Sequence, residues 1–152
     1  MAGRILSVCI SSKKGTKKKE VNSALLIPEW GIEGDAHAGK WERQVSLLSA
    51  GEVKKMKEII PDLKPGDFAE NIIIEGLNLN KIKIGDEIMI GNNIILTVSK
   101  IGKECHTQCQ IKELTGKCIM PEKGIFTRVL KGGRIEKGSP VEIKRRNTHE
   151  AE

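Results

Sequence analysis

The sequence predicts a mainly β fold: a closed or nearly closed β-barrel with a few peripheral helices. Eight short β-rich segments recur along the 152 residues, separated by turn residues such as Gly-Asp, Gly-Asn-Asn, Gly-Lys and Gly-Gly. Short apolar segments bounded by such turns are typical of strands. A barrel is favoured because closure removes the edges at which a basic, Ile-rich sheet would aggregate.

The elements follow from local patterns. The expected strands are Ile5–Ile10, Ala24–Ile27, Asn71–Ile74, Lys81–Ile84, Glu87–Ile90, Ile94–Val98, Gly124–Leu130 and Val141–Ile143. A helix is expected over Ser49–Ile60, because Ser49 and Glu52 form a capping box and Pro61 ends the segment. Its apolar face should pack on the barrel through Val53, Met56, Ile59 and Ile60.

Two further local features are expected. A weaker helical turn is expected from Gln110 to Leu114. The segments Lys83–Ile88 and Glu136–Val141 are near-duplicates, and both predict a tight turn in which Gly supplies the backbone freedom. We attach no chemistry to this repetition.

Length and the N-terminus predict a single cytoplasmic domain. Residues 1–152 are expected to form one domain, with a core over about 5–143 and a polar tail over 144–152. The apolar run Ile5–Ile10 is too short for a signal peptide or a membrane span. We therefore expect no membrane partner.

The charge predicts an anionic partner. Lys and Arg total 26 against 20 Asp and Glu, a net charge of +6. The lysine runs at 13–14 and 17–19 and the basic run at 144–146 are more typical of solvated loops and tails than of binding sites. With two Phe, two Trp and no Tyr, the chain lacks stacking platforms for nucleic acid. A small molecule that carries phosphate fits this composition better.

Four cysteines without a secretory signal argue against a disulfide framework. Cys105 follows an expected strand and lies between Lys103 and His106, which would lower the pKa of a thiol and favour the nucleophilic, metal-ligating thiolate. A buried, unreactive cysteine is the alternative. A structural zinc site is also open, formed by Cys105, His106, Cys109 and Cys118.

Three other segments carry candidate groups. The loop Gly34–Lys40 contains His37 and is followed by Arg43, and these side chains suit anion binding or proton transfer. Arg128, on an alternating strand, could reach a phosphate or lie on the surface. In Gly66–Ile72 we expect scaffold: Asp67 and Asn71 hold a turn and Phe68 fills the core.

Four segments occur in a recognisable order: Gly31–His37, Arg43–Leu48, Gly66–Asn71 and Gly124–Gly133. Taken together they resemble the MOSC domain family, and above all its short stand-alone bacterial members, which look like the C-terminal domain of molybdenum cofactor sulfurases. The resemblance implies a β-barrel with a reactive cysteine after a late strand, the position of Cys105. It also implies that Ser12 and Lys13 hold the cofactor phosphate, with Arg43 and Arg128 as secondary contacts; Lys103 is a further cation beside Cys105.

By the same resemblance, the chain should bind the molybdenum cofactor or carry sulfur for it. Cys105 would ligate molybdenum or hold a persulfide, with His106 and His37 beside it. A cysteine desulfurase or a molybdoenzyme would be the partner, and no pyridoxal phosphate should bind, because the desulfurase domain is absent from the sequence. An enzyme is the alternative, either a sulfur transferase or a molybdenum-dependent reductase of N-hydroxylated compounds. A zinc-stabilised or nucleic-acid-binding barrel is less favoured.

Overall fold

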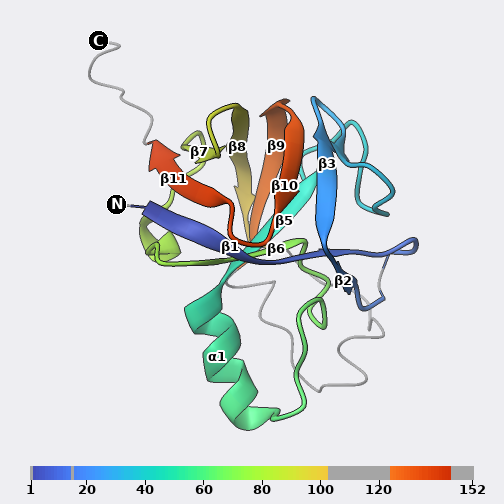
Figure 1. Cartoon of the computed structure of the whole chain (residues 1–152), viewed down its shortest axis with the longest axis vertical. Coiled ribbons are helices and arrows are strands. Elements are labelled where there is room, and N and C mark those ends of the chain that lie inside the picture. Colours follow the sequence, from blue (N-terminus) through green and yellow to red (C-terminus); the bar gives the residue numbers. More distant parts are fainter. Residues whose placement is uncertain (1, 15, 103–123, 145–152) are drawn as a thin grey trace.

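The computed structural model describes residues 2–14, 16–102 and 124–144 and confirms the predicted barrel (Figure 1). The strands are β1 Ala2–Ile10, β2 Lys19–Val21, β3 Ser23–Ile27, β4 Gly31–Ile32, β5 Val45–Ser49, β6 Ile72–Glu75, β7 Glu87–Ile90, β8 Ile94–Ile101, β9 Ile125–Lys131, β10 Gly133–Glu136 and β11 Pro140–Lys144. In the described ranges there is one α-helix, α1 Ala50–Ile59, and a 3₁₀ turn, η1 Leu79–Lys81.

Seven strands close the barrel in the order β11-β7-β8-β9-β5-β6-β1, and pairing of β1 with β11 completes the circle. β1 does this because it is long: its start pairs with β11, its middle with β6 and its end with β2. Among the described pairings, β5 with β6 is parallel and the others are antiparallel. The strands β10, β3 and β4 form a second, smaller sheet.

Two apolar clusters divide the interior. The larger fills the barrel with inward-facing strand residues such as Ile5, Leu47 and Val129. The smaller lies between the barrel and α1 and contains Met56 and Phe68. The helix therefore packs on the outside of the barrel, at the end from which it projects in Figure 1, as predicted.

The local signals of the sequence are confirmed where side chains bond to nearby backbone. Ser49 caps α1, its Oγ accepting a hydrogen bond from the N–H of Gly51. The two near-duplicate turns share one hydrogen-bond pattern, in which Asp86 Oδ2 accepts from Lys83 N and Ser139 Oγ from Glu136 N. The sequence repeat is thus a repeat of turn structure.

Some expected elements were wrong. Lys81–Ile84 is not a strand: Leu79–Lys81 forms a 3₁₀ turn, and Ile84 is 62% exposed in the turn that follows. Ile59, expected on the packed face of α1, is 59% exposed. Conversely, β5 was missed because its residues Val45–Leu48 are buried on both faces and show no alternation. The expected helical turn at 110–114 lies outside the described residues.

Candidate functional site

Two loops on one side of the barrel form the candidate site. The first, residues 11–18, joins β1 to β2, and the second, residues 33–44, joins β4 to β5. The N–H of Ala36 donates to the Ser11 carbonyl at 2.8 Å and ties the loops together. Residues far apart in sequence therefore meet here.

The loops are held by a buried ion pair. Lys18 Nζ lies 2.7 Å from Asp35 Oδ1, and both side chains have no exposed surface. Burial lowers the pKa of Lys18, and the Asp35 carboxylate opposes that shift. Asp35 also accepts from the backbone N–H groups of Ser11 and His37, each at 3.1 Å. The carboxylate is thus fully engaged in joining the two loops.

Lys18 also determines which ring nitrogen of His37 carries the proton. Its ammonium group has three protons and three neighbours: Asp35 Oδ1, Ser11 Oγ at 3.1 Å and His37 Nδ1 at 3.0 Å. An ammonium group donates and cannot accept, so Nδ1 of His37 must be the acceptor. We infer that the neutral imidazole carries its proton on Nε2. His37, whose side chain is 18% exposed, is thereby fixed as a hydrogen-bond donor at Nε2.

Two cationic side chains lie against the ring of Trp41, beside His37. Its Nε1 donates to the His37 carbonyl at 2.8 Å, and the two rings are parallel with centroids 6.3 Å apart. The Lys14 ammonium lies 4.5 Å and the Arg43 guanidinium 4.6 Å from the Trp41 ring centroid. Such cation–π contacts stabilise by about 0.5–1 kcal/mol each at exposed sites. Within the described part of the chain, neither cation has a carboxylate partner.

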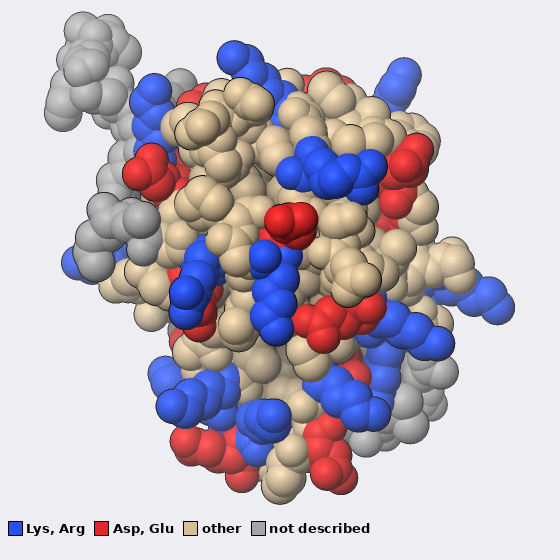
Figure 2. All heavy atoms as spheres, viewed as in Figure 1, with Lys and Arg blue, Asp and Glu red and all other residues tan. Residues whose placement is uncertain are grey.

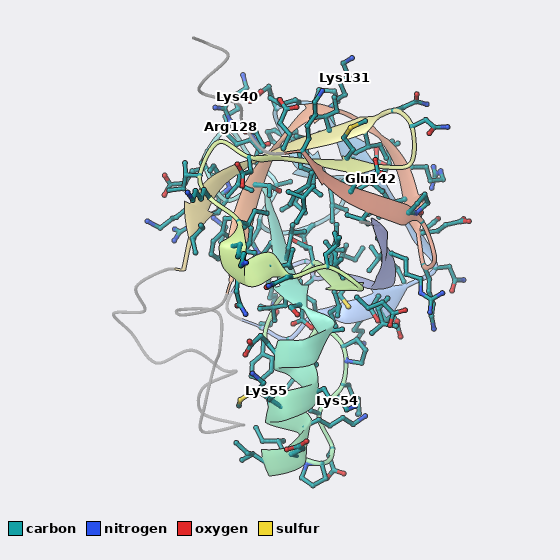
Figure 3. All side chains as sticks on the ribbon, turned by 90° about the vertical axis from the view of Figure 1, so that its left-hand side faces the viewer. Lys40, Lys54, Lys55, Arg128, Lys131 and Glu142 are labelled. Atoms are coloured by element: carbon teal, nitrogen blue, oxygen red, sulfur yellow. The ribbon has the colours of Figure 1, made fainter. Side chains whose placement is uncertain are left out.

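A pocket of about 460 Å³ adjoins this ring, lined by Glu29, Lys40, Trp41, Glu42, Gln44 and Arg128. Lys40 and Arg128 lie near each other at the barrel end away from α1 (Figure 3). Arg128 pairs with Glu29, so its charge is partly balanced, whereas Gln44 is buried and its Oε1 accepts from Val129 N at 2.9 Å. We call Lys14, His37, Trp41, Arg43 and this pocket the Trp41 surface.

The segment Gly66–Ile72, predicted to be scaffold, contacts the backbone of Lys18 in the first loop of the site. Asp67 accepts from Lys64 N, and Phe68 is buried in the smaller core. The Glu70 carboxylate accepts from the N–H groups of Gly66 and Phe68, while burial raises its pKa to about 7. Gly66 has a φ of +92°, and a Cβ there would lie 2.1 Å from the Lys18 carbonyl oxygen. This close approach positions the backbone of Lys18.

The predicted site residues are only partly gathered here. His37 and Arg43 belong to the Trp41 surface, and Arg128 lines its pocket. Ser12 and Lys13 are exposed, and it is Lys14 that reaches Trp41. Sequence reasoning missed Lys14, Lys18 and Trp41 as site residues. The lysine runs gave no signal that distinguishes their members.

Lys103, Cys105, His106, Cys109 and Cys118 lie outside the described residues, so their predicted roles stay predictions. The nearest described residues on either side, Gly102 and Gly124, are hydrogen-bonded, since Gly102 N donates to the Gly124 carbonyl at 2.7 Å. On β8, Lys100 Nζ is 3.9 Å from Glu42 Oε2 of the second loop. The Arg43 guanidinium is 6.0 Å from the Phe126 ring. Through Lys100 and Phe126, the described strands β8 and β9 therefore contact the second loop of the site.

Two negative findings apply to the described ranges alone. Residues 2–14, 16–102 and 124–144 contain no group of three or more His, Cys, Asp or Glu side chains arranged to hold a metal ion. The same residues form no helix with the length and apolar character that crossing a bilayer requires. The zinc alternative rests on residues outside these ranges.

Comparison with known proteins gives a family and a fold. The YuaD protein of Bacillus subtilis superposes with a TM-score of 0.78 at 18% identity, covering 96% of this chain and 97% of that one. YiiM of Geobacillus stearothermophilus gives 0.71 at 20% identity, covering 95% and 76%. YiiM of Escherichia coli gives 0.68 at 19% identity, covering 96% and 71%. No curated protein sequence matches significantly.

At these identities the solved structures establish the shared fold alone. The sequence itself matches the family model of the MOSC domain over residues 34–142, which includes the second loop of the site and most of the barrel. This match covers well over half of the chain. The protein therefore belongs to the MOSC domain family.

Proposed function

We propose that the Trp41 surface binds the molybdenum cofactor and that Cys105 carries sulfur or ligates molybdenum during cofactor sulfuration or delivery. At the level of the family, MOSC membership associates the chain with the molybdenum cofactor and with sulfur chemistry. The particular role in sulfuration or delivery is our proposal. It rests on the chemistry of the residues around Trp41.

The observation that carries the proposal is the placement of Lys14 and Arg43 against one indole ring without a described carboxylate partner. Two cations at one ring, with no carboxylate partner among the described residues, attract an anion, and a guanidinium suits phosphate especially well. The adjoining pocket of about 460 Å³ falls within the roughly 300–1,000 Å³ typical of small-molecule sites. A ligand with a phosphate and a planar ring system fits both features.

The side chains of the surface have distinct expected roles. Lys14 and Arg43 would hold the phosphate, and Lys40 would add charge at the pocket. Arg128 would have to exchange its Glu29 partner for the ligand, so we expect it to contribute less. His37 would donate a hydrogen bond from Nε2 rather than accept a proton, because Lys18 occupies Nδ1. When bound, the cofactor supplies molybdenum-centred redox or sulfur chemistry beside the pocket.

The test compares cofactor content in matched variants. Protein purified from a host that makes the cofactor is assayed for molybdenum and for pterin. Lys14→Gln/Arg43→Gln should lose most of both, since it removes the two cations that lie against Trp41. Lys131→Gln/Lys144→Gln removes the same charge from exposed positions on β9 and β11 and should keep wild-type content. Equal content in the two double variants, or none in the wild type, contradicts the proposal.

A further inference from the structure

A small apolar pocket lies at the other end of the molecule, between β1, α1 and the segment after α1. It has a volume of about 210 Å³, and its apolar lining is Leu6, Ala50, Val53, Leu63, Pro65 and Ile73. We call it the helix groove. Lys54, which also lines it, lies on α1 at the end opposite Lys40 and Arg128 (Figure 3). The groove is therefore separate from the Trp41 surface.

A β-bulge turns one apolar side chain toward this groove. The pairing of β1 with β6 passes from Ile5 opposite Ile74 directly to Ser7 opposite Ile73, which leaves Leu6 without a partner. Bulges commonly redirect a side chain in this way. Leu6 lines the groove and is only half-buried, as is Val53 opposite it on α1. The described residues thus leave an apolar hollow open to solvent.

The rim of the groove is positively charged. Lys54 and Lys57 of α1 and Lys64 of the following segment line it, all three exposed, and its described lining contains no acidic residue. A neighbouring pocket shares Lys64 and adds Lys17 and Lys19, with Glu20 and Asp67 as its acids. Figure 2 looks onto this face and shows Lys and Arg on both sides of an uncharged strip at α1, with Asp and Glu below them at the lower end of the molecule.

We propose that the helix groove binds an acidic segment of a partner protein, with one large apolar side chain of that segment in the pocket. The volume of about 210 Å³ is below the range of roughly 300–1,000 Å³ for whole small-molecule ligands, but it admits a single anchoring side chain. Acidic residues on either side of the anchor would face Lys54, Lys57 and Lys64. Such charge complementarity speeds encounter and sets orientation.

A protein segment suits the groove better than a lipid surface. Binding in a bilayer interface needs a broad apolar face on the helix, whereas α1 exposes one large apolar side chain, Ile59, which does not line the groove. A confined hollow ringed by lysines selects one side chain with acidic neighbours. This interaction does not depend on the function proposed for the Trp41 surface.

The test uses a fluorescein-labelled synthetic peptide with a central Leu-Phe pair between runs of Asp and Glu. Fluorescence anisotropy should detect binding that weakens about tenfold in Lys54→Glu/Lys57→Glu, because two attractive contacts become repulsive. The control Lys55→Glu/Lys131→Glu makes the same change in net charge outside the groove and should change affinity less than about twofold. Thermal melts establish that each variant is folded.

Two further measurements test whether binding needs the apolar side chain of the peptide or only its charge. A peptide with Ala-Ala in place of Leu-Phe should bind several-fold more weakly, and Ala50→Phe, which places a ring at the groove lining, should have the same effect on the original peptide. Lys14→Gln/Arg43→Gln should bind the peptide as the wild type does, whatever its cofactor content.

The proposal is overturned if the peptide does not bind, if both charge-reversal variants weaken binding equally, or if the Ala-Ala peptide binds as well as the original. It is likewise overturned if phosphatidylserine vesicles bind through the same lysines more tightly than the peptide.

Discussion

Replacing Lys18 by Met should destabilise the protein far more than replacing its neighbour Lys17. Lys18 Nζ lies 2.7 Å from Asp35 with both side chains fully buried, whereas Lys17 Nζ is 3.9 Å from Asp67 and its side chain is 39% exposed. Removing one partner of a buried pair costs about 3–5 kcal/mol, because the remaining charge stays buried. An exposed pair contributes about 0–1 kcal/mol.

We expect Lys18→Met to lower the free energy of unfolding by about 3 kcal/mol, the lower end of that range. The reason is that Asp35 keeps two backbone N–H donors, from Ser11 and His37. Lys17→Met should cost less than about 1 kcal/mol. Urea unfolding of both variants measures the difference. Lys18→Met/Asp35→Asn should recover part of the loss, since the buried charge is removed along with its partner.

A second readout separates positioning of His37 from stability. In the wild type, nitrogen NMR shifts should show His37 protonated at Nε2 and bare at Nδ1, because Lys18 donates to Nδ1. Lys18→Met should allow the other tautomer, and Lys17→Met should not. If the two variants unfold at the same urea concentration and leave His37 unchanged, Lys18 neither stabilises the buried network nor holds the His37 tautomer.

Three other predictions follow from the site and its supports. Cys105→Ser should abolish cofactor-dependent or sulfur-transfer activity without unfolding the protein, and Cys109→Ser and Cys118→Ser should have milder effects. If these cysteines formed a zinc cluster instead, each of the three substitutions would lower the melting temperature, and a chelator would unfold the wild type. Burial raises the pKa of Glu70 from 4.5 to about 7, so between these pH values the folded protein keeps a proton that the unfolded chain loses. The free energy of unfolding should therefore fall as the pH rises from 4.5 to about 7. Glu70→Gln should lack this dependence on pH when its denaturation is measured over the same range. Gly66→Ala should destabilise by at least about 2 kcal/mol more than Gly34→Ala, because both glycines have positive φ but a Cβ at Gly34 meets nothing within 4 Å; equal melting temperatures would contradict this.

The sequence by itself determined the features that depend on close neighbours along the chain. The Ser49 cap and the turns at Asp86 and Ser139 are made by side chains that bond to backbone two or three residues away. Such contacts form wherever those residues occur together, so their patterns were readable. The barrel class was predicted from the recurrence of short strands and turns, the outer helix from its cap and apolar face, and the MOSC family from the resemblance of four segments; all three are confirmed.

Only the tertiary structure decided which members of a charged run carry a role. Within the lysine run at 17–19, Lys17 and Lys19 keep exposed surface, whereas Lys18 is buried against Asp35, 17 residues further along the chain. Likewise Lys14, and not Lys13, reaches Trp41. The three side chains of such a run are chemically identical, and burial depends on which one meets a distant carboxylate once the loops have packed. That contact exists only in three dimensions, because folding brings together groups that local sequence keeps apart.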